Sequence, residues 1–135
     1  MPERLAKPRK TASFKEYMEY YLERKNWSQN KLAIAARLNQ SQVNKIINGT
    51  VYTVQVDTLV CLCLVLQLNL DESKDLLARA ERAFSPASVL HQTYQELIKI
   101  YAKRPLDCSD NVGFFDEADH ILTAKGLPVL PNCYR

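Results

Sequence analysis

Glycine is scarce in this chain of 135 residues, and no long run alternates valine, isoleucine or threonine with polar residues. Such alternation is the usual sign of a half-buried β-strand, so its absence argues against a β-sheet protein. Apolar residues still make up 47% of the sequence, which is enough for a buried core and argues against disorder of the whole chain. The sequence therefore predicts an all-α protein.

Long hydrophobic runs and paired cysteines are missing as well. The most apolar segment, residues 59–66, is far shorter than the roughly 20 residues that a membrane-spanning helix needs. Nothing resembles a secretion signal, and no C-x-x-C pair occurs among the four cysteines, Cys61, Cys63, Cys108 and Cys133. These absences predict a soluble, cytoplasmic protein with reduced thiols instead of a disulfide framework, and no membrane partner.

The patterns of common catalytic and metal sites are also absent. There is no phosphate-binding loop and no G-x-S-x-G sequence, and His91 and His120 lie far apart without a partner ligand at helical spacing. Asp116, Glu117 and Asp119 fall where a helix is expected to begin, a position at which carboxylates favour the helix dipole. We therefore expect a non-enzyme without catalytic residues, metal ligands or a cofactor.

Charge is distributed unevenly, although the net charge is only +3. Residues 1–50 contain ten Lys and Arg against four Glu, a net of +6. Residues 51–135 contain eight Lys and Arg against eleven Asp and Glu, a net of −3. The first part of the chain is therefore the part that would attract a polyanion.

Capping residues and apolar spacing predict seven helices. Ser13, Ser28, Asp71 and Ser85 are the expected N-caps of four of them, and Pro86 is expected at the first position of the sixth. The expected ranges are 14–25, 29–36, 40–48, 56–67, 72–83, 86–103 and 114–125, with Gly49 and Gly126 ending the third and seventh.

The stretch "LNQSQVNKIING" at residues 38–49 gives one of these helices an unusual polar face. Val43, Ile46 and Ile47 follow helical spacing, so they can seat one face on a core. The other face presents amides, a hydroxyl and an ammonium, on Gln40, Ser41, Gln42, Asn44 and Lys45. A small helix so rich in hydrogen-bonding groups is suited to contact a polar partner.

Residues 13 to about 70 resemble the lambda-repressor-like helix-turn-helix family, also called the Cro or XRE family. The resemblance is carried by "SQNKLA" at 28–33, "QSQVNKIING" at 40–49, "DTL" at 57–59 and "LVLQLNL" at 64–70. In that family the first of these segments opens the supporting helix, and the second is the recognition helix. The resemblance implies a five-helix DNA-binding domain, here residues 13–84, and the caps and apolar spacing predict two further helices after it.

This resemblance also implies which side chains touch double-stranded DNA. Its base-reading positions fall on Gln40, Ser41 and Lys45, with Asn44 and Gln42 as neighbours, and Gln or Asn can bond bidentately to adenine. The candidate phosphate contacts are Gln29, Asn48, Thr50 and Ser28. The alternative interpretation is that these are ordinary solvent-facing polar residues.

Arg37 departs from the family pattern, which usually has glycine in the turn between the second and third helices. A residue other than glycine in a left-handed turn costs about 1 kcal/mol, which a fold worth roughly 5 to 15 kcal/mol tolerates. The departure leaves the tilt of the recognition helix open.

Residues 1–12 are expected to form a flexible basic arm. It either follows phosphates or acts as a disordered, solubilising tail, and its candidate contacts are Arg4, Lys7, Arg9 and Lys10.

The fourth helix is apolar on more than one face. Its core-facing residues would be Leu59, Leu62, Cys63 and Leu66, which leaves a second strip, the possible interface of Val60, Cys61, Leu64 and Val65. Two covers are available: the helices of residues 85–135, or a second copy of the protein. Residues 85–135 resemble a tail found on some bacterial proteins of this class, and they are expected to pack on the fourth helix or to mediate dimerisation.

The resulting hypothesis is a transcriptional regulator of bacterial or phage origin. It would be a repressor that binds a short palindromic operator as a homodimer, and no small-molecule effector is evident. The alternative is a protein–protein interaction module, such as an antitoxin or an adaptor, that has the same fold but no longer reads DNA.

Overall fold

A computed structural model describes residues 6–49, 54–104 and 111–134 of the chain. These residues contain helices and no strand, so the all-α prediction, with five helices followed by two more, is confirmed. The helices are α1 (Phe14–Lys25), α2 (Gln29–Ala35), α3 (Gln40–Ile47), α4 (Val56–Val65), α5 (Leu70–Arg79), α6 (Val89–Tyr101) and α7 (Asn111–Ala124). The last helix starts three residues before its predicted range, and Gly126, with φ of 73°, follows its end.

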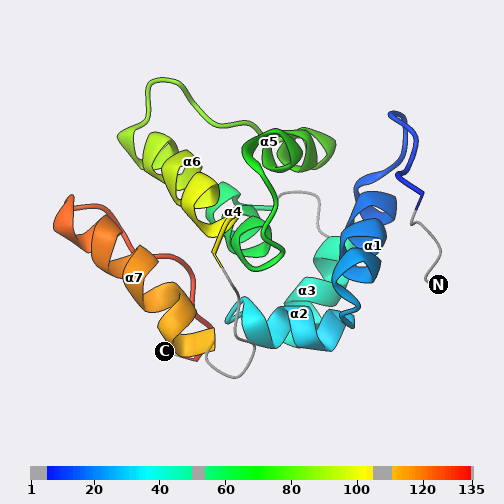
Figure 1. Ribbon diagram of the computed structural model, residues 1–135, viewed down its shortest axis with the longest axis horizontal. Coiled ribbons are helices and arrows are strands. Elements are labelled where there is room, and N and C mark those ends of the chain that lie inside the picture. The colour runs from blue at the N-terminus through cyan, green and yellow to red at the C-terminus, as the bar shows by residue number, and fades with distance from the viewer. Residues whose placement is uncertain (1–5, 50–53, 105–110, 135) are drawn as a thin grey trace.

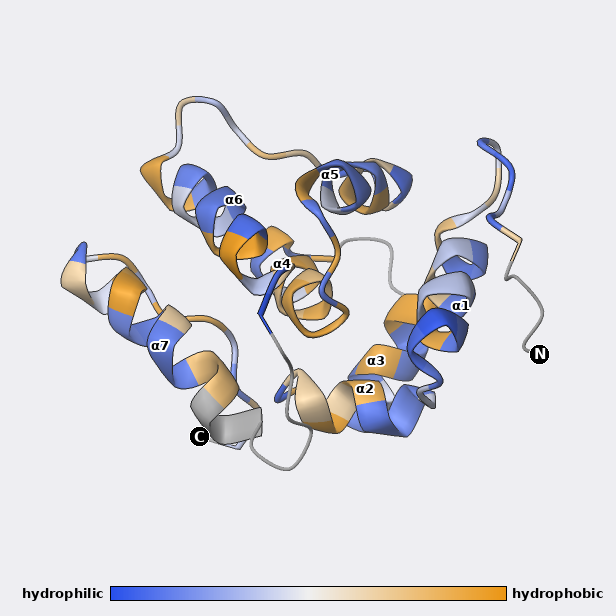
Figure 2. Ribbon diagram, in the orientation of Figure 1, coloured by the Kyte–Doolittle hydropathy of each residue, from blue (hydrophilic) through white to orange (hydrophobic). Residues whose placement is uncertain are grey.

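Helix α4 lies at the centre of the molecule (Figure 1). It packs against α2, α5 and α6, while α1 contacts α3 and α5, and α7 lies on α6. Its apolar residues cover almost the whole helix, whereas the outer helices show separate polar and apolar faces (Figure 2). An all-round apolar helix is typical of a buried position, and here α4 supplies the core of both halves of the chain.

The second apolar strip of α4 is covered by the chain's own C-terminal helices. Val60, Cys61, Leu64 and Val65 are each 0% exposed, and α6 lies against α4. Fully buried side chains offer no surface to another molecule. This burial corrects the prediction that these four residues are a possible interface with a second copy. Burial also raises the pKa of both thiols of the helix, that of Cys63 to about 12, and neither cysteine forms a disulfide.

Two helices start at caps other than the predicted ones. Helix α6 is capped by Ser88, whose side chain accepts a hydrogen bond from the backbone N–H of His91, so it begins three residues after Pro86. The predicted cap, Ser85, accepts instead from the N–H of Ala87 within the preceding turn. Both serines are plausible caps by residue type, and the packing of the connecting segment selects the second.

Helix α5 begins at a capping box formed by Asn69 and Glu72, not at the predicted cap Asp71. The Glu72 N–H donates to Asn69 Oδ1 at 2.8 Å, and the Asn69 N–H donates to Glu72 Oε1 at 3.0 Å. Arg24 of α1 adds a hydrogen bond to the same carboxylate at 2.7 Å, which joins α1 to α5. Burial alone would raise the pKa of Glu72, but these hydrogen bonds outweigh it and lower the pKa below its usual value.

We expect Glu72→Gln to lower the free energy of unfolding at pH 7 by about 0.5 to 1 kcal/mol, because it keeps the cap but loses the ion pair with a partly exposed arginine. A carboxyl with a lowered folded-state pKa stabilises the fold above its unfolded pKa, and this contribution is lost as the pH falls through the folded value. The difference between the two proteins should therefore shrink below about pH 4. Urea unfolding at pH 7 and pH 3.5 measures it, and a difference that stays constant with pH would contradict the assignment.

The start of the chain is held in place from Pro8 onward, which differs from the predicted flexible arm. The Tyr17 hydroxyl donates to the Pro8 carbonyl at 3.0 Å, and Arg79 Nη1 donates to the carbonyls of Lys10 and Ala12, each at 2.7 Å. The Arg79 guanidinium also lies 3.8 Å from the centroid of the Tyr17 ring. These hydrogen bonds from side chains of α1 and α5 to backbone carbonyls fix residues 8–12 against the two helices.

Candidate nucleic-acid interface

The turn between α2 and α3 has the left-handed conformation expected of it. Arg37 follows the α2 C-cap with φ of 58°, and its N–H donates to the Ile34 carbonyl at 3.2 Å. The next N–H, that of Leu38, donates to the Ala33 carbonyl at 2.9 Å. This pair of bonds satisfies carbonyls at the end of α2 and directs the chain into α3.

Asn39 caps the start of α3, a role that the sequence prediction did not assign to it. Its side-chain Oδ1 accepts hydrogen bonds from the N–H groups of Ser41 and Gln42, at 2.9 and 3.4 Å. Asparagine is among the preferred N-cap residues, so its type and its place just before "QSQV" were the available signals. The cap fixes the backbone of the first turn of α3, from which Gln40, Ser41 and Gln42 project.

Helix α3 buries its apolar residues and exposes every predicted base-reading residue. Val43, Ile46 and Ile47 are buried, and α3 packs on α2 and α1. The exposed set is Gln40, Ser41, Gln42, Asn44, Lys45 and Asn48. The structure thus places these polar side chains on one continuous exposed surface, which we call the α3 polar face.

Directions within the α3 polar face follow from helix geometry. Each residue is turned by about 100° from the one before it, and the buried residues lie on one side of the helix. Ser41, Lys45 and Asn48 therefore point most directly outward. Gln40 lies on one flank of the helix and Gln42 on the opposite flank.

The start of α2 adds three polar residues to this region. Ser28 caps the helix and accepts from the Lys31 N–H at 3.1 Å, which leaves its hydroxyl hydrogen able to donate to another group. Gln29 is half-buried and Lys31 is exposed, with its ammonium 5.6 Å from the centroid of the Trp27 ring. Lys31 was not predicted, although its position two residues after Gln29 was visible in the sequence. Thr50 lies outside the described residues.

Two cations of the predicted arm, Lys7 and Lys10, lie beside acidic groups of α5, away from the α3 polar face. Lys7 and Lys10 line a surface hollow together with Asp71, Glu72 and Asp75, and no α3 residue lines it. In Figure 1 the start of α1 and α5 are at the top, whereas α2 and α3 are at the bottom. Arg9 is exposed, and Arg4 lies outside the described residues. The structure therefore brings neither Lys7 nor Lys10 to α3.

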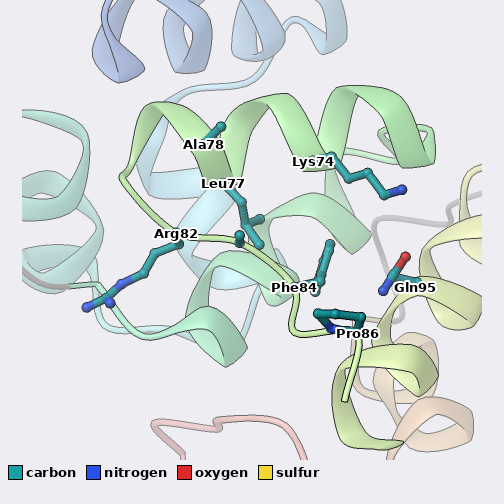
Figure 3. A pocket seen from close by; sticks show the side chains of 8 residues that line it. Lys74, Leu77, Ala78, Arg82, Phe84, Pro86 and Gln95 are labelled. Carbon is teal, nitrogen blue, oxygen red and sulfur yellow. The ribbon is translucent and has the colours of Figure 1, made fainter. Parts of the chain in front are cut away.

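A second hollow, of about 310 Å³, lies between α5 and the segment that leads to α6 (Figure 3). Leu77, Phe84 and Pro86 form its apolar lining, and Lys74 and Gln95 are at one end. The Arg82 guanidinium points away from the lining, and its Nε donates to the Val54 carbonyl at 2.9 Å. Arg82 therefore holds the residues just before α4 in place.

Within the described residues, no three His, Cys, Asp or Glu side chains are grouped so that they could hold a metal ion. Nor does any helix there have the length and apolar character needed to cross a membrane.

Comparison with family models gives a match over the first part of the chain. Residues 18–73, which run from α1 into the first turn of α5, match the family model of the Cro/C1-type HTH DNA-binding domain. The matched segment contains α2, the Arg37 turn and the whole α3 polar face. No curated protein and no solved structure matched the chain.

Proposed function

We propose that the protein regulates transcription by reading a DNA sequence with α3, because residues 18–73 match the family model of the Cro/C1-type HTH DNA-binding domain. The observation that carries the proposal is the α3 polar face. Six polar side chains are exposed there, while the apolar residues of the same helix are buried. A helix of this form fits the major groove, where base edges present donors and acceptors.

In the proposed complex the roles are divided between α3 and α2. Gln40, Ser41 and Lys45 read base edges, with Asn44 and Gln42 as neighbours. Phosphates are held by Gln29, Ser28 and Asn48, and by Thr50. Contacts to phosphates set the register of the protein on DNA, and contacts to bases set the sequence.

We further propose that the protein represses by occupancy, as a dimer on a short palindrome. Two recognition helices would then enter successive major grooves about 34 Å apart. The dimer surface would have to lie outside α4, since Val60 and Leu64 are buried. The large apolar side chains exposed in the described part of the chain are Ile34, Val89, Ile100 and Tyr134. In this proposal residues 13–84 bind DNA, and residues 85–135 support that domain from the side of α4.

The test is selection of duplexes from a random pool by the full-length protein, followed by titration onto the selected duplex and onto a shuffled one at 50 and 200 mM salt. A specific regulator should enrich one motif and prefer it by 10³-fold or more. With about 6 to 10 phosphate contacts, its affinity should fall by roughly 10³ to 10⁵ between the two salt concentrations. A pool that yields no motif, with equal and weak binding to both duplexes, would refute DNA reading and favour the interaction module.

A further inference from the structure

We propose that Arg37 is a positioning residue for the recognition helix, because it ties the turn before α3 to the C-terminal extension. Within residues 85–135, this link is made by Asp119 of α7 and by the tail that follows α7. In this arrangement the extension sets the orientation of α3 in the groove. The consequence for DNA rests on the function proposed above, whereas the tie itself does not.

The first contact is a buried ion pair between segments 82 positions apart. Arg37 Nη1 donates to Asp119 Oδ2 at 2.9 Å, and the Arg37 residue is only 4% exposed. The guanidinium also lies over the Phe115 ring, 4.5 Å from its centroid. Helix α7 therefore holds the Arg37 side chain by charge and by stacking.

The second contact joins the same turn to the tail after α7. The Cys133 N–H donates to the Arg37 carbonyl at 2.9 Å. Asp119 uses its other oxygen, Oδ1, to accept from the Leu130 N–H at 3.1 Å. Asp119 thus binds the turn with one oxygen and the tail with the other, and the tail returns to bind the turn.

Stability alone does not explain an arginine at this place. Its φ of 58° disfavours any residue with a side chain, and glycine would remove that strain. Among the described residues, Nε and Nη2 of Arg37 have no hydrogen-bond partner although they are buried. A buried pair that is incompletely satisfied adds little stability, and such pairs are retained in some proteins because they fix one geometry.

Because Arg37 lies close to the start of α3, a small shift of Arg37 would also move the residues that are proposed to read bases. It lies two positions before the N-cap Asn39 and three before Gln40, with no flexible segment between them. After α3 in the sequence, the hydrogen bond from Arg82 Nε to the Val54 carbonyl holds the residues that lead into α4. Later parts of the chain therefore hold Arg37, which precedes α3, and Val54, which follows it.

The test compares Arg37→Gly and Asp119→Asn with the full-length protein and with Asp116→Asn, which changes an exposed carboxylate on the same helix. Binding to the selected duplex and to shuffled DNA is measured at a temperature where circular dichroism shows every variant folded. We expect Arg37→Gly and Asp119→Asn to bind the selected duplex 10-fold or more weakly, with binding to shuffled DNA unchanged. Because both changes remove the same contact, the double variant should bind the selected duplex no more weakly than the single variants do. Asp116→Asn should bind it as the wild type does.

Amide hydrogen exchange of residues 38–42 provides a readout that does not involve DNA. Exchange there should be faster in Arg37→Gly than in the wild type. If the wild type selects no DNA motif, the proposed function fails, and exchange alone then decides whether the tie exists. Should Arg37→Gly not fold, Arg37→Lys replaces it, and we expect weaker specific binding because an ammonium reproduces neither the planar fork nor the stacking. A folded variant with wild-type exchange and wild-type preference would overturn the proposal.

Discussion

Replacement of Leu64 by aspartate is expected to unfold the whole chain, not to separate two copies of it. Leu64 is 0% exposed at the centre of the core shared by α4, α5 and α6. Truncation of a buried leucine alone costs about 2 to 5 kcal/mol. A buried, unpaired carboxylate costs more, so the loss approaches the roughly 5 to 15 kcal/mol of a whole domain.

Circular dichroism and analytical ultracentrifugation of Leu64→Asp check this expectation. The matched control is Gln92→Asp on α6, where the side chain is exposed and polar and the change should stay within about 0.5 kcal/mol. A folded Leu64→Asp monomer, obtained from a dimeric wild type, would contradict the intramolecular cover of α4. It would instead support the contact between copies through α4 that the sequence left open.

The second large effect is expected at the α3 polar face. Gln40→Ala should weaken binding to the selected duplex by about 1 to 3 kcal/mol and relax the preference at one base position. Lys45 is one of the residues that point most directly outward from α3. If Lys45 reads guanine, Lys45→Ala should relax the preference at a different base position. The physical reason is that each loss leaves base-edge groups without their bidentate partner.

Binding of each variant to a panel of single-base changes in the selected duplex measures this effect. Gln92→Ala and Lys99→Ala serve as controls, since both residues are exposed on α6. These controls should bind the whole panel as the wild type does. If Gln40→Ala also kept the wild-type preference at every position, α3 would read DNA through other side chains and the assigned roles would be wrong.

The local part of the fold could be predicted because it depends on neighbours in the sequence. Ser13 and the apolar spacing behind it gave α1 its observed range, and the spacing of Val43, Ile46 and Ile47 gave the buried side of α3. The caps of α5 and α6 were missed by two or three positions, because Asn69 and Asp71 are comparable caps by type and packing chooses between them.

The long-range part could not be predicted from one sequence. The apolar strip on α4 indicated that something covers it, but not whether that cover is the chain itself or a second copy. The partner of Arg37 was hidden for the same reason, since eleven Asp and Glu residues follow position 50 and nothing local singles out Asp119. Such pairings depend on how distant helices dock, which local propensity does not encode.

The central place of α4 has a consequence for modularity. A unit that can be exchanged between proteins needs a core of its own, and here one core spans residues on both sides of position 85. The protein should therefore unfold in one cooperative transition, with no intermediate in which only the first five helices survive. A chimera that grafts residues 1–84 onto another C-terminal partner would need a helix shaped to the outer side of α4, or it would present a bare apolar patch and aggregate.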